Sequence, residues 1–201
     1  QASSQYFEKS KDYVRKSRTK IVVGTKELDG AHYLKKYPIF SHSTSKMIGG
    51  FPLKEVSFTV INKNNEELDF INNEIKIYKG LVLNDSSVEW IPQGVFIASP
   101  ENVETSPTTL EITVKATDKA VNTEILRIDN IVYPCSELNY IKDVVQQCGL
   151  ELESESFPFP EHILNERPNY DETSTSCREI ISRFAEERGC IAIMSRTGKV
   201  W

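Results

Sequence analysis

Histidines and paired acids are the side chains of this sequence that could act in acid–base catalysis. The three histidines, His32, His42 and His162, lie far apart in predicted loops, and none has metal-motif spacing such as H-E-x-x-H. The acid pairs Asp171-Glu172 and Glu186-Glu187 could transfer protons only inside a cleft, and we predict solvated positions for both. The chain contains no G-x-S-x-G, phosphate-loop or G-x-G-x-x-G motif. The sequence predicts no catalytic residues, no cofactor and no enzyme.

Cysteine thiols are the second kind of reactive group. The chain has four of them: Cys135, Cys148, Cys177 and Cys190. None shows C-x-x-C spacing, so no metal site is predicted. Each consecutive pair brackets a predicted helix, whose ends lie about 18 Å apart at the rise of an α-helix. This exceeds the reach of a disulfide, so bridges within these two pairs are excluded if the helices form. We interpret all four cysteines as reduced, mostly buried small hydrophobic residues.

Cys177 lies at the start of a predicted helix, where the thiol pKa is lowered by the helix N-terminus. No histidine lies near it in the sequence to act as a base. We therefore prefer a role in packing or in the capping turn over a catalytic role.

The composition indicates a globular protein of one or two domains. The 201 residues are 39% hydrophobic and 26% charged, which is ordinary for soluble domains. The longest apolar runs, such as Ile21-Val22-Val23, are too short to span a bilayer, and no signal-peptide pattern is present. Since the chain begins at Gln1 instead of Met, we expect a processed or excised piece of a longer protein.

The net charge of −5 is unevenly distributed. Residues 9–20 hold six Lys or Arg and one acid, whereas residues 151–187 hold ten acids and three Arg. A basic arm can bind nucleic acid or an acidic partner. Because the arginines and aromatics do not interleave, we prefer a solvated helix face at 4–16 and predict no specific nucleic-acid partner.

Residues 20–118 carry the alternation of β-strands. The clearest case is residues 110–117, where Leu110, Ile112, Val114 and Ala116 alternate with polar positions. Strands are predicted at 20–23, 55–61, 75–78, 81–83, 88–91, 94–99 and 110–117. Many short strands separated by Gly, Pro and Asn predict an antiparallel barrel or tight sandwich. The predicted core residues are Phe58, Val60, Ile77, Phe96, Ile112 and Val114.

After residue 118 the pattern becomes helical. Ser136 begins one predicted helix that Gly149 ends, and a capping box at 176–179 begins a second that Gly189 ends. The two segments superpose at an offset of 40 residues: Ile141 on Ile181, Val144 on Phe184, Val145 on Ala185, Gly149 on Gly189 and Leu152 on Ala192. We predict an α+β fold with a polar segment at 1–19, a β-barrel at 20–118 and a small α+β domain at 119–201 with both helices on one sheet.

The order of these segments resembles a known family. The motifs that carry the resemblance are Gly49-Gly50-Phe51-Pro52, Lys54–Val60 (KEVSFTV), Glu74–Tyr78 (EIKIY), Ile91–Ser99 (IPQGVFIAS), Leu110–Lys119 (LEITVKATDK), Thr175–Glu179 (TSCRE) and Arg196–Lys199 (RTGK). In this order and spacing, residues 20–201 resemble the N-terminal part of the phage tail hub family. That family includes baseplate hubs, tail-associated proteins and their prophage or bacteriocin versions. Segments 1–19 and 153–174 have no counterpart in the resemblance.

The resemblance implies a structural role. In such hubs a tube-type barrel is followed by an inserted α+β domain, and the chain then returns to build a second barrel. It implies that this chain is an N-terminal fragment, with Trp201 in the strand after the turn at 196–199. It also implies a homotrimeric ring in a virion tail or tail-like particle, assembled in the host cytoplasm. The partners would be the tube or distal tail protein and the spike or fibre, and the fragment alone would be monomeric or weakly associated.

Two other functions remain open at this stage. The chain could be a self-contained module of a surface or prophage protein that binds a cell-wall glycan through Trp90, Tyr78, Phe157 and Phe159. It could also be a peptidoglycan-cleaving enzyme, which the missing catalytic motifs disfavour.

Overall fold

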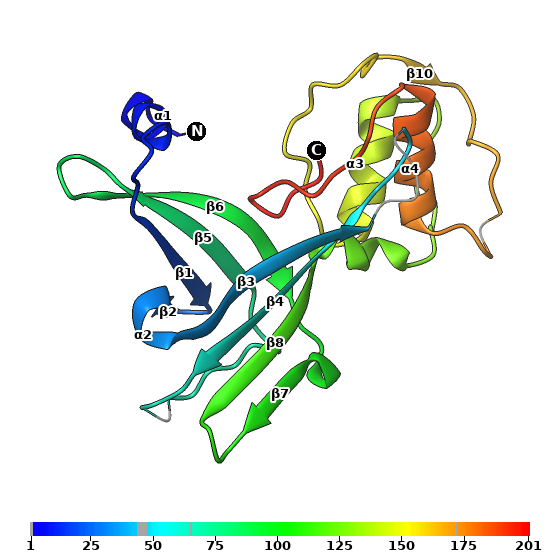
Figure 1. Ribbon diagram of the computed structural model, residues 1–201. Helices are drawn as coiled ribbons and strands as arrows, with labels where there is room; N and C mark the ends of the chain where they lie inside the picture. Colours follow the sequence, from blue (N-terminus) through cyan, green and yellow to red (C-terminus); the bar gives the residue numbers. More distant parts are fainter. Residues whose placement is uncertain (1, 44–47, 65, 172) are drawn as a thin grey trace. The chain divides into compact units, whose positions relative to one another are not determined.

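The computed structural model of the chain describes residues 2–43, 48–64, 66–171 and 173–201 (Figure 1). It contains two compact units. Unit 1 comprises Gln1–Ser41 and Glu55–Thr117, and unit 2 comprises His42–Lys54 and Asp118–Trp201. The chain therefore passes from one unit to the other three times. Independent folding of the predicted domains 1–19, 20–118 and 119–201 stays a prediction.

Most β-strands of the described residues belong to one large sheet, which lies mainly in unit 1. Its eight strands are β1 Ser17–Val23, β2 Lys26–Asp29, β3 Leu34–Ser43, β4 Leu53–Ile61, β5 Ile75–Val82, β6 Val88–Ile97, β7 Val103–Ser106 and β8 Glu111–Asp118. Their order is β2-β1-β5-β6-β8-β4-β3, with β7 beside β8. The pairings β1–β2, β1–β5, β5–β6, β4–β8 and β7–β8 are all antiparallel, as predicted.

Two pairs of predicted strands are continuous in the structure. Residues 75–78 and 81–82 belong to β5, and residues 88–91 and 94–97 belong to β6. The interruptions in the apolar pattern lie near a change of register between β5 and β6. It occurs between Ile77 and Tyr78, where β6 contains one additional residue. An irregularity that breaks the sequence pattern therefore leaves the strand intact.

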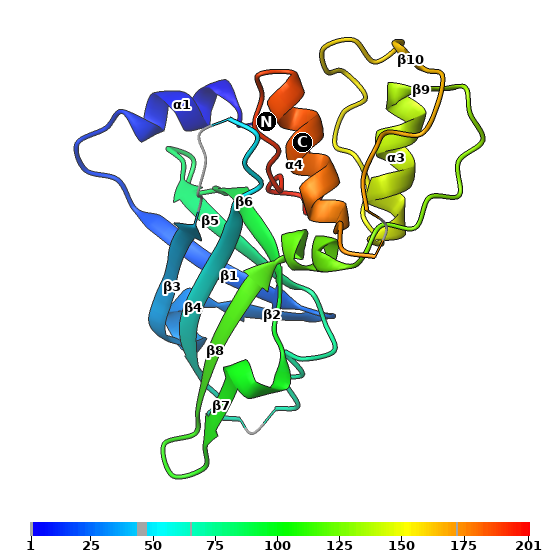
Figure 2. The same cartoon turned by 90° about the vertical axis from the view of Figure 1, so that its right-hand side faces the viewer.

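The core of unit 1 contains all six residues predicted to be buried. The ring of Phe58 packs edge-on to Phe70 at 5.9 Å between centroids. Leu28, in the strand at one end of the sheet order, and Phe40, in the strand at the other end, contribute to the same core. The sheet is therefore strongly curved (Figure 2). Its order runs as an open path from β2 to β3 in the described residues, so closure into a barrel is not confirmed.

Three short helices accompany the strands of unit 1. Helix α1 spans Ser4–Ser10, shorter than the predicted 4–16, and α2 spans Gly30–Tyr33. The 3₁₀ turn η1 spans Pro100–Asn102. Ser3 caps α1 and also hydrogen-bonds Glu89 in β6, which holds the polar N-terminal helix on this unit.

Unit 2 is built around two helices, α3 Glu137–Gln147 and α4 Cys177–Glu187. Both have eleven residues and begin 40 positions apart. Ser136 and Ser176 are their N-caps, and Gly149 and Gly189 follow them with φ of +67° and +65°. The predicted offset of 40 residues is confirmed. The helices lie side by side and antiparallel (Figures 1 and 2).

Short extended segments pack against these helices. Val200 pairs with Leu152 in parallel and with Met194 in antiparallel register, and the Ala192 N–H donates to the Gly50 carbonyl at 3.1 Å. Trp201 exchanges two backbone hydrogen bonds with Ile193, as expected for a strand after the turn at 196–199. Elsewhere the 3₁₀ turn η2 spans Lys119–Glu124, and the strands β9 Cys135–Ser136 and β10 Ile163–Leu164 pair with each other.

Gly49 shows why one backbone position of unit 2 requires glycine. Its φ is +68°, and a Cβ added there would lie 2.4 Å from the Cβ of Glu186 in α4. Only glycine lets this segment approach α4 so closely and adopt this conformation. The Gly49 N–H then donates to the Cys190 carbonyl at 2.9 Å.

The capping box predicted at the start of α4 is confirmed. The Ser176 hydroxyl accepts from the Glu179 N–H at 3.2 Å, and Glu179 accepts from the Ser176 N–H at 2.9 Å. We expect Ser176→Ala to lower the free energy of unfolding by about 1 kcal/mol, because a free amide at the helix start loses its acceptor. Chemical denaturation measures this. Glu179→Gln keeps an acceptor and should cost less; equal stability of Ser176→Ala and the unmodified chain would contradict the prediction.

Candidate interaction surfaces

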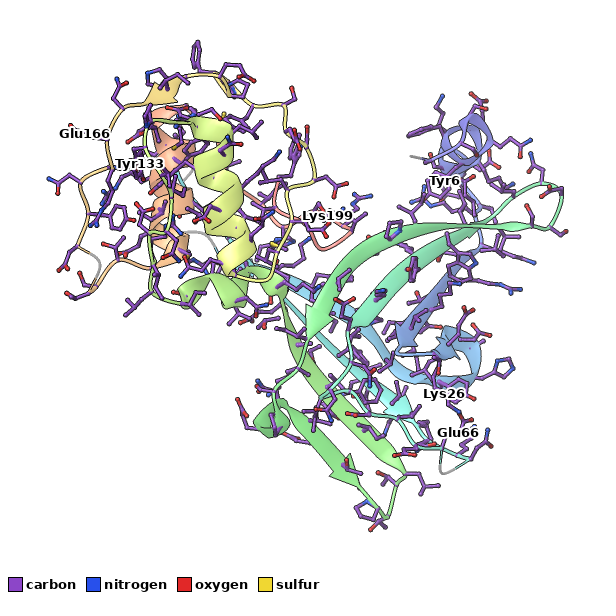
Figure 3. All side chains as sticks on the ribbon, turned by 180° about the vertical axis from the view of Figure 1, so that it is seen from behind. Tyr6, Lys26, Glu66, Tyr133, Glu166 and Lys199 are labelled. Carbon is purple, nitrogen blue, oxygen red and sulfur yellow. The ribbon has the colours of Figure 1, made fainter. Side chains whose placement is uncertain are left out.

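The two end strands of the sheet in unit 1 differ in how open their edges are. At one end, β2 has only four residues, and Lys26 Nζ lies 3.4 Å from Glu66 Oε2 (Figure 3). The Tyr33 hydroxyl also donates to Glu66 at 2.9 Å. The loop that carries Glu66 is thereby held beside β2. Short strands with attached loops are poor templates for further pairing.

The other end strand, β3, offers a longer surface. It has ten residues, and Tyr37 and Ile39 are 57% and 70% exposed. Side chains two residues apart share a face of a strand, so these two form one exposed apolar pair. Pro38 lacks an N–H and interrupts the row of donors, as is common on edge strands. A neighbouring protein can therefore contact this edge and its apolar pair.

Two aromatics proposed for glycan binding, Tyr78 and Trp90, lie together in unit 1. Lys20 Nζ is 5.4 Å from the centre of the Tyr78 ring and 4.8 Å from that of Trp90, and it also pairs with Glu27 at 2.9 Å. The Trp90 ring lies over Gly80, where an added Cβ would be 2.8 Å from the ring carbons. The Trp90 ring thus already packs against its own chain.

The other two proposed aromatics, Phe157 and Phe159, lie in unit 2 and differ from each other in their packing and exposure. Phe157 packs edge-on to Phe184 of α4 at 5.3 Å between centroids. Phe159 is 76% exposed and has a φ of +61°, which is unusual for a bulky residue. Trp90 and Phe157 are therefore already in contact with other residues of their own units.

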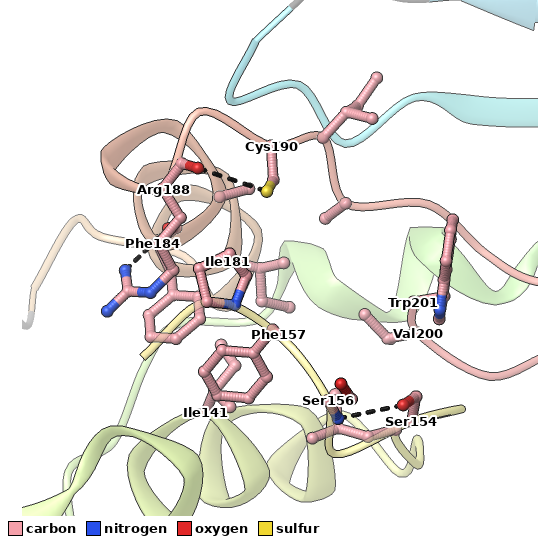
Figure 4. Close-up of a pocket in the computed structure, with 15 residues that line it drawn as sticks. Ile141, Ser154, Ser156, Phe157, Ile181, Phe184, Arg188, Cys190, Val200 and Trp201 are labelled. Atoms are coloured by element: carbon pink, nitrogen blue, oxygen red, sulfur yellow. Dashed lines mark hydrogen bonds between the residues drawn. The ribbon is translucent and has the colours of Figure 1, made fainter. Parts of the chain in front are cut away.

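Phe157 lines an apolar groove of unit 2 with a volume of about 200 Å³ (Figure 4). Its walls come from both helices, the loop at 154–158 and the C-terminal hairpin. The lining residues named in Figure 4 are Ile141, Ser154, Ser156, Phe157, Ile181, Phe184, Arg188, Cys190, Val200 and Trp201. Since the walls are mostly carbon, the groove suits an apolar side chain better than a charged substrate.

All three histidines were predicted in loops, but His32 lies in α2 and His42 is exposed in β3. His32 and His162 each contact an acid. His32 lies 3.0 Å from Asp29, and His162 lies 2.7 Å from Glu137. Glu186 and Glu187 lie at exposed positions of α4, and Glu172 of the other predicted acid pair lies outside the described residues. In the described part of the chain, no three His, Cys, Asp or Glu side chains gather as a metal site would require. In the same part, no helix has the length and apolar character needed to cross a membrane.

The cysteines partly follow the prediction. All four are free: Cys148 and Cys177 are buried, Cys135 is partly buried and Cys190 is exposed. Cys177, the residue with the best electrostatic position for reactivity, has no exposed surface. Its side chain packs in the core of unit 2.

A buried ionic cluster in unit 2 was missed by the sequence analysis. Arg127 is 1% exposed, and its guanidinium lies 2.6 Å from Asp143 and 3.4 Å from Asp129. Asp129 also accepts hydrogen bonds from the hydroxyls of Tyr133 and Tyr170 at 2.8 and 3.3 Å. Burial, reinforced by the Asp129 carboxylate, raises the pKa of Tyr133. The cluster fixes the segment before α3 and keeps these tyrosines protonated.

Comparisons with known proteins address the fold. No protein-family model matches the sequence, and no curated protein matches it. The tail protein from Neisseria meningitidis MC58 superposes with a TM-score of 0.54 at 14% identity, over 92% of this chain and 49% of that chain. The chain shares the fold of a tail protein. The 43 kDa tail protein of prophage MuSo2 from Shewanella oneidensis gives a TM-score of 0.48 at 16% identity, over 91% and 51%. The chain spans about half the length of both proteins.

The similarity covers nearly all of this chain, and so includes residues of both units. At this level of identity the likeness concerns the backbone, and the side chains described above are properties of this chain.

Asp118 gives the tail-protein fold a pH-sensitive position. Its carboxylate accepts hydrogen bonds from the N–H groups of Lys54 and Ala120, both at 3.2 Å, yet burial raises its pKa to about 6. A raised pKa means that the folded state binds the proton more tightly than the unfolded state. We therefore expect stability to fall by roughly 2–3 kcal/mol as pH rises from about 4 to 6.

The measurement is the difference in unfolding free energy between the natural chain and Asp118→Asn across this pH range. The difference cancels the opposite contributions of carboxylates whose pKa is lowered, such as Asp69 and Asp85. A difference that does not change with pH would show that the two hydrogen bonds cancel the effect of burial, and a difference that rises with pH would show that they outweigh it.

Proposed function

We propose that this chain is the N-terminal part of a phage tail hub. The hub is a structural protein of the tail tip or baseplate that joins the tail tube to the spike or fibre. The observation that carries the proposal is the fold shared with the Neisseria tail protein over 92% of this chain. The sequence motifs between residues 20 and 201, in the order found in tail hubs, support it independently.

The surfaces of unit 1 fit such a role. A hub works through protein contacts made by sheet edges and β-surfaces, without a substrate pocket. The β3 strand has this character, because the apolar side chains of Tyr37 and Ile39 are exposed on an end strand. In this proposal the chain has no catalytic residue, cofactor or metal. Its partners are the tube or distal tail protein and the spike or fibre.

We infer the oligomeric state of the parent protein from the symmetry of phage tails. A tail tube has sixfold symmetry and its tip device has threefold symmetry, so a hub must present six similar barrels from three chains. A protein with two related barrels per chain achieves this as a homotrimer. The chain described here spans about half of the similar tail proteins and holds one large sheet. We therefore propose a ring-shaped trimer for the parent protein.

We expect this chain alone to be monomeric or weakly associated, because half of the ring contacts are missing and the area per contact falls towards the transient range. The parent protein should sediment as a trimer at tens of micromolar and form rings in electron microscopy. In the parent, Ile39→Asp should weaken the trimer by placing a charge on the exposed β3 edge. Val132→Asp, at an 85% exposed position of unit 2, is the matched control. A monomeric parent without rings would refute the hub.

That outcome would favour the alternative, a module that binds a cell-wall glycan. The contacts of Trp90 with Lys20 and Gly80, and of Phe157 with Phe184, make this function the weaker candidate. Binding of purified cell wall that Trp90→Ala abolishes would support it.

A further inference from the structure

Helices α3 and α4 approach each other at both ends, each time through the first residue of one helix and the C-cap residue of the other. At one end, Glu137, the first residue of α3, forms an ion pair with Arg188, the C-cap residue of α4. With the offset of 40 residues, Glu137 of α3 is equivalent to Cys177 of α4, and Cys148 is equivalent to Arg188. At the other end, Cys177 is accordingly the first residue of α4 and Cys148 the C-cap residue of α3. The antiparallel arrangement thus brings a thiol pair together where the opposite end has an ion pair.

The thiols of Cys148 and Cys177 are neighbours in one core. They are 6% and 0% exposed, and each shifts the pKa of the other. The Cys148 thiol also lies 3.3 Å from the carbonyl oxygen of Val144. The hydrogen bond from Cys148 lowers the pKa of Cys177, and the same contact with burial raises the pKa of Cys148. Cys177 at the N-terminus of α4 is therefore the better thiolate of the pair.

We propose that Cys148 and Cys177 are a disulfide-forming pair that locks α3 to α4 under oxidising conditions. The oxidant would be a low-molecular-weight disulfide such as oxidised glutathione. The Cys177 thiolate attacks one of its sulfurs and expels the first glutathione thiolate. The Cys148 thiol then loses its proton, and its sulfur attacks the mixed disulfide at Cys177 and expels the second. Both thiol protons end on the released glutathiones, so two thiols are oxidised and one disulfide is reduced.

The remaining cysteines do not share this geometry. Cys135 lies in β9 before α3, and Cys190 is exposed beyond the end of α4. Because Cys148 and Cys177 are buried, the exchange requires local opening of the helix ends and should be slow. Once formed, the bond would close a loop that contains residues 149–176, and it would restrict the unfolded chain accordingly.

The biological setting rests on the proposed function. A tail protein is assembled in a reducing cytoplasm, where these thiols would stay free, and the released particle meets oxidising surroundings. Oxidation would then stiffen unit 2 after assembly, when flexibility of the helix pair is no longer needed.

The test uses the unmodified chain, incubated for a day with excess oxidised or reduced glutathione at mildly alkaline pH. After oxidation, without any reductant, we expect a mass 2 Da lower once the mass of any glutathione bound at Cys190 is subtracted. We also expect a cross-linked peptide pair containing Cys148 and Cys177 and a rise in melting temperature of roughly 5–10 °C. Cys177→Ala should abolish all three changes, whereas Cys190→Ala, the control, should retain them.

Alkylation of the oxidised chain after denaturation identifies the cysteines that have remained free thiols. If Cys148 and Cys177 both remain free while exposed Cys190 has reacted with glutathione, the disulfide pair is refuted, even if Cys177→Ala fails to fold. A bond between any other two cysteines would refute it as well. None of these results depends on trimer formation by the parent, so the pair and the hub can fail separately.

Discussion

Phe58→Ala should lower the free energy of unfolding by about 3–5 kcal/mol, the usual cost of truncating a buried phenylalanine. Phe58 is 1% exposed in the centre of β4, where it faces Val114 of β8 across the ladder and packs on the ring of Phe70. Removing the ring loses this apolar contact area and leaves a cavity that the rigid strands on both sides cannot fill. Denaturant unfolding followed by a probe in unit 1 measures the loss.

Phe7→Ala is the matched control for this change. Phe7 belongs to the same unit but is 57% exposed in α1, so its removal should alter stability by less than about 0.5 kcal/mol. If both variants melt close to the unmodified chain, Phe58 does not face the core and the curved sheet described here is wrong.

Arg127→Ala should cost a similar amount, about 3–5 kcal/mol, for an electrostatic reason. The change removes the buried cation between Asp143 and Asp129, and the Asp129 side chain is only 3% exposed. The Asp129 carboxylate would then keep only Arg167, 4.0 Å away, as a cationic neighbour. Denaturant unfolding of the variant and of the unmodified chain measures the loss.

Arg196→Ala, at an exposed position of the C-terminal turn, controls for removing an arginine and should be nearly neutral. The double variant Arg127→Ala with Asp129→Ala should cost less than the sum of the single changes, because neither charge is then left alone. Additive losses would show that the two side chains do not act as one cluster.

The parts of the fold that follow from local rules could be predicted from the sequence. Alternation places Phe58, Val60 and Val114 inside, because successive side chains of a strand point to opposite faces. Serine caps and glycine stops define α3 and α4 to within a residue, because these groups satisfy the free amides and allow a positive φ. Such signals need only neighbours in sequence.

The remaining parts depend on distant contacts. Strand β3 was not predicted, since Lys35, Lys36 and Tyr37 are all exposed and hide the alternation of an edge strand. From the sequence alone Arg127 would be assigned to the surface, because only the folded chain places Asp143 and Asp129 beside its guanidinium. The contact between Cys148 and Cys177 could be anticipated only by combining the offset of 40 with the antiparallel packing of the helices.

The discontinuous make-up of unit 2 bears on how the protein folds as it is synthesised. Gly49 and Gly50 leave the ribosome early, but their hydrogen-bond partners, Cys190 and Ala192, follow about 140 residues later. At ordinary translation rates this delay is roughly 7–28 s. Every residue of unit 1 is made before residue 118, so the sheet can form while the loop at residues 48–52 still lacks its partners. Nascent chains arrested after residue 117 and after residue 192 should therefore differ in protease protection at this loop.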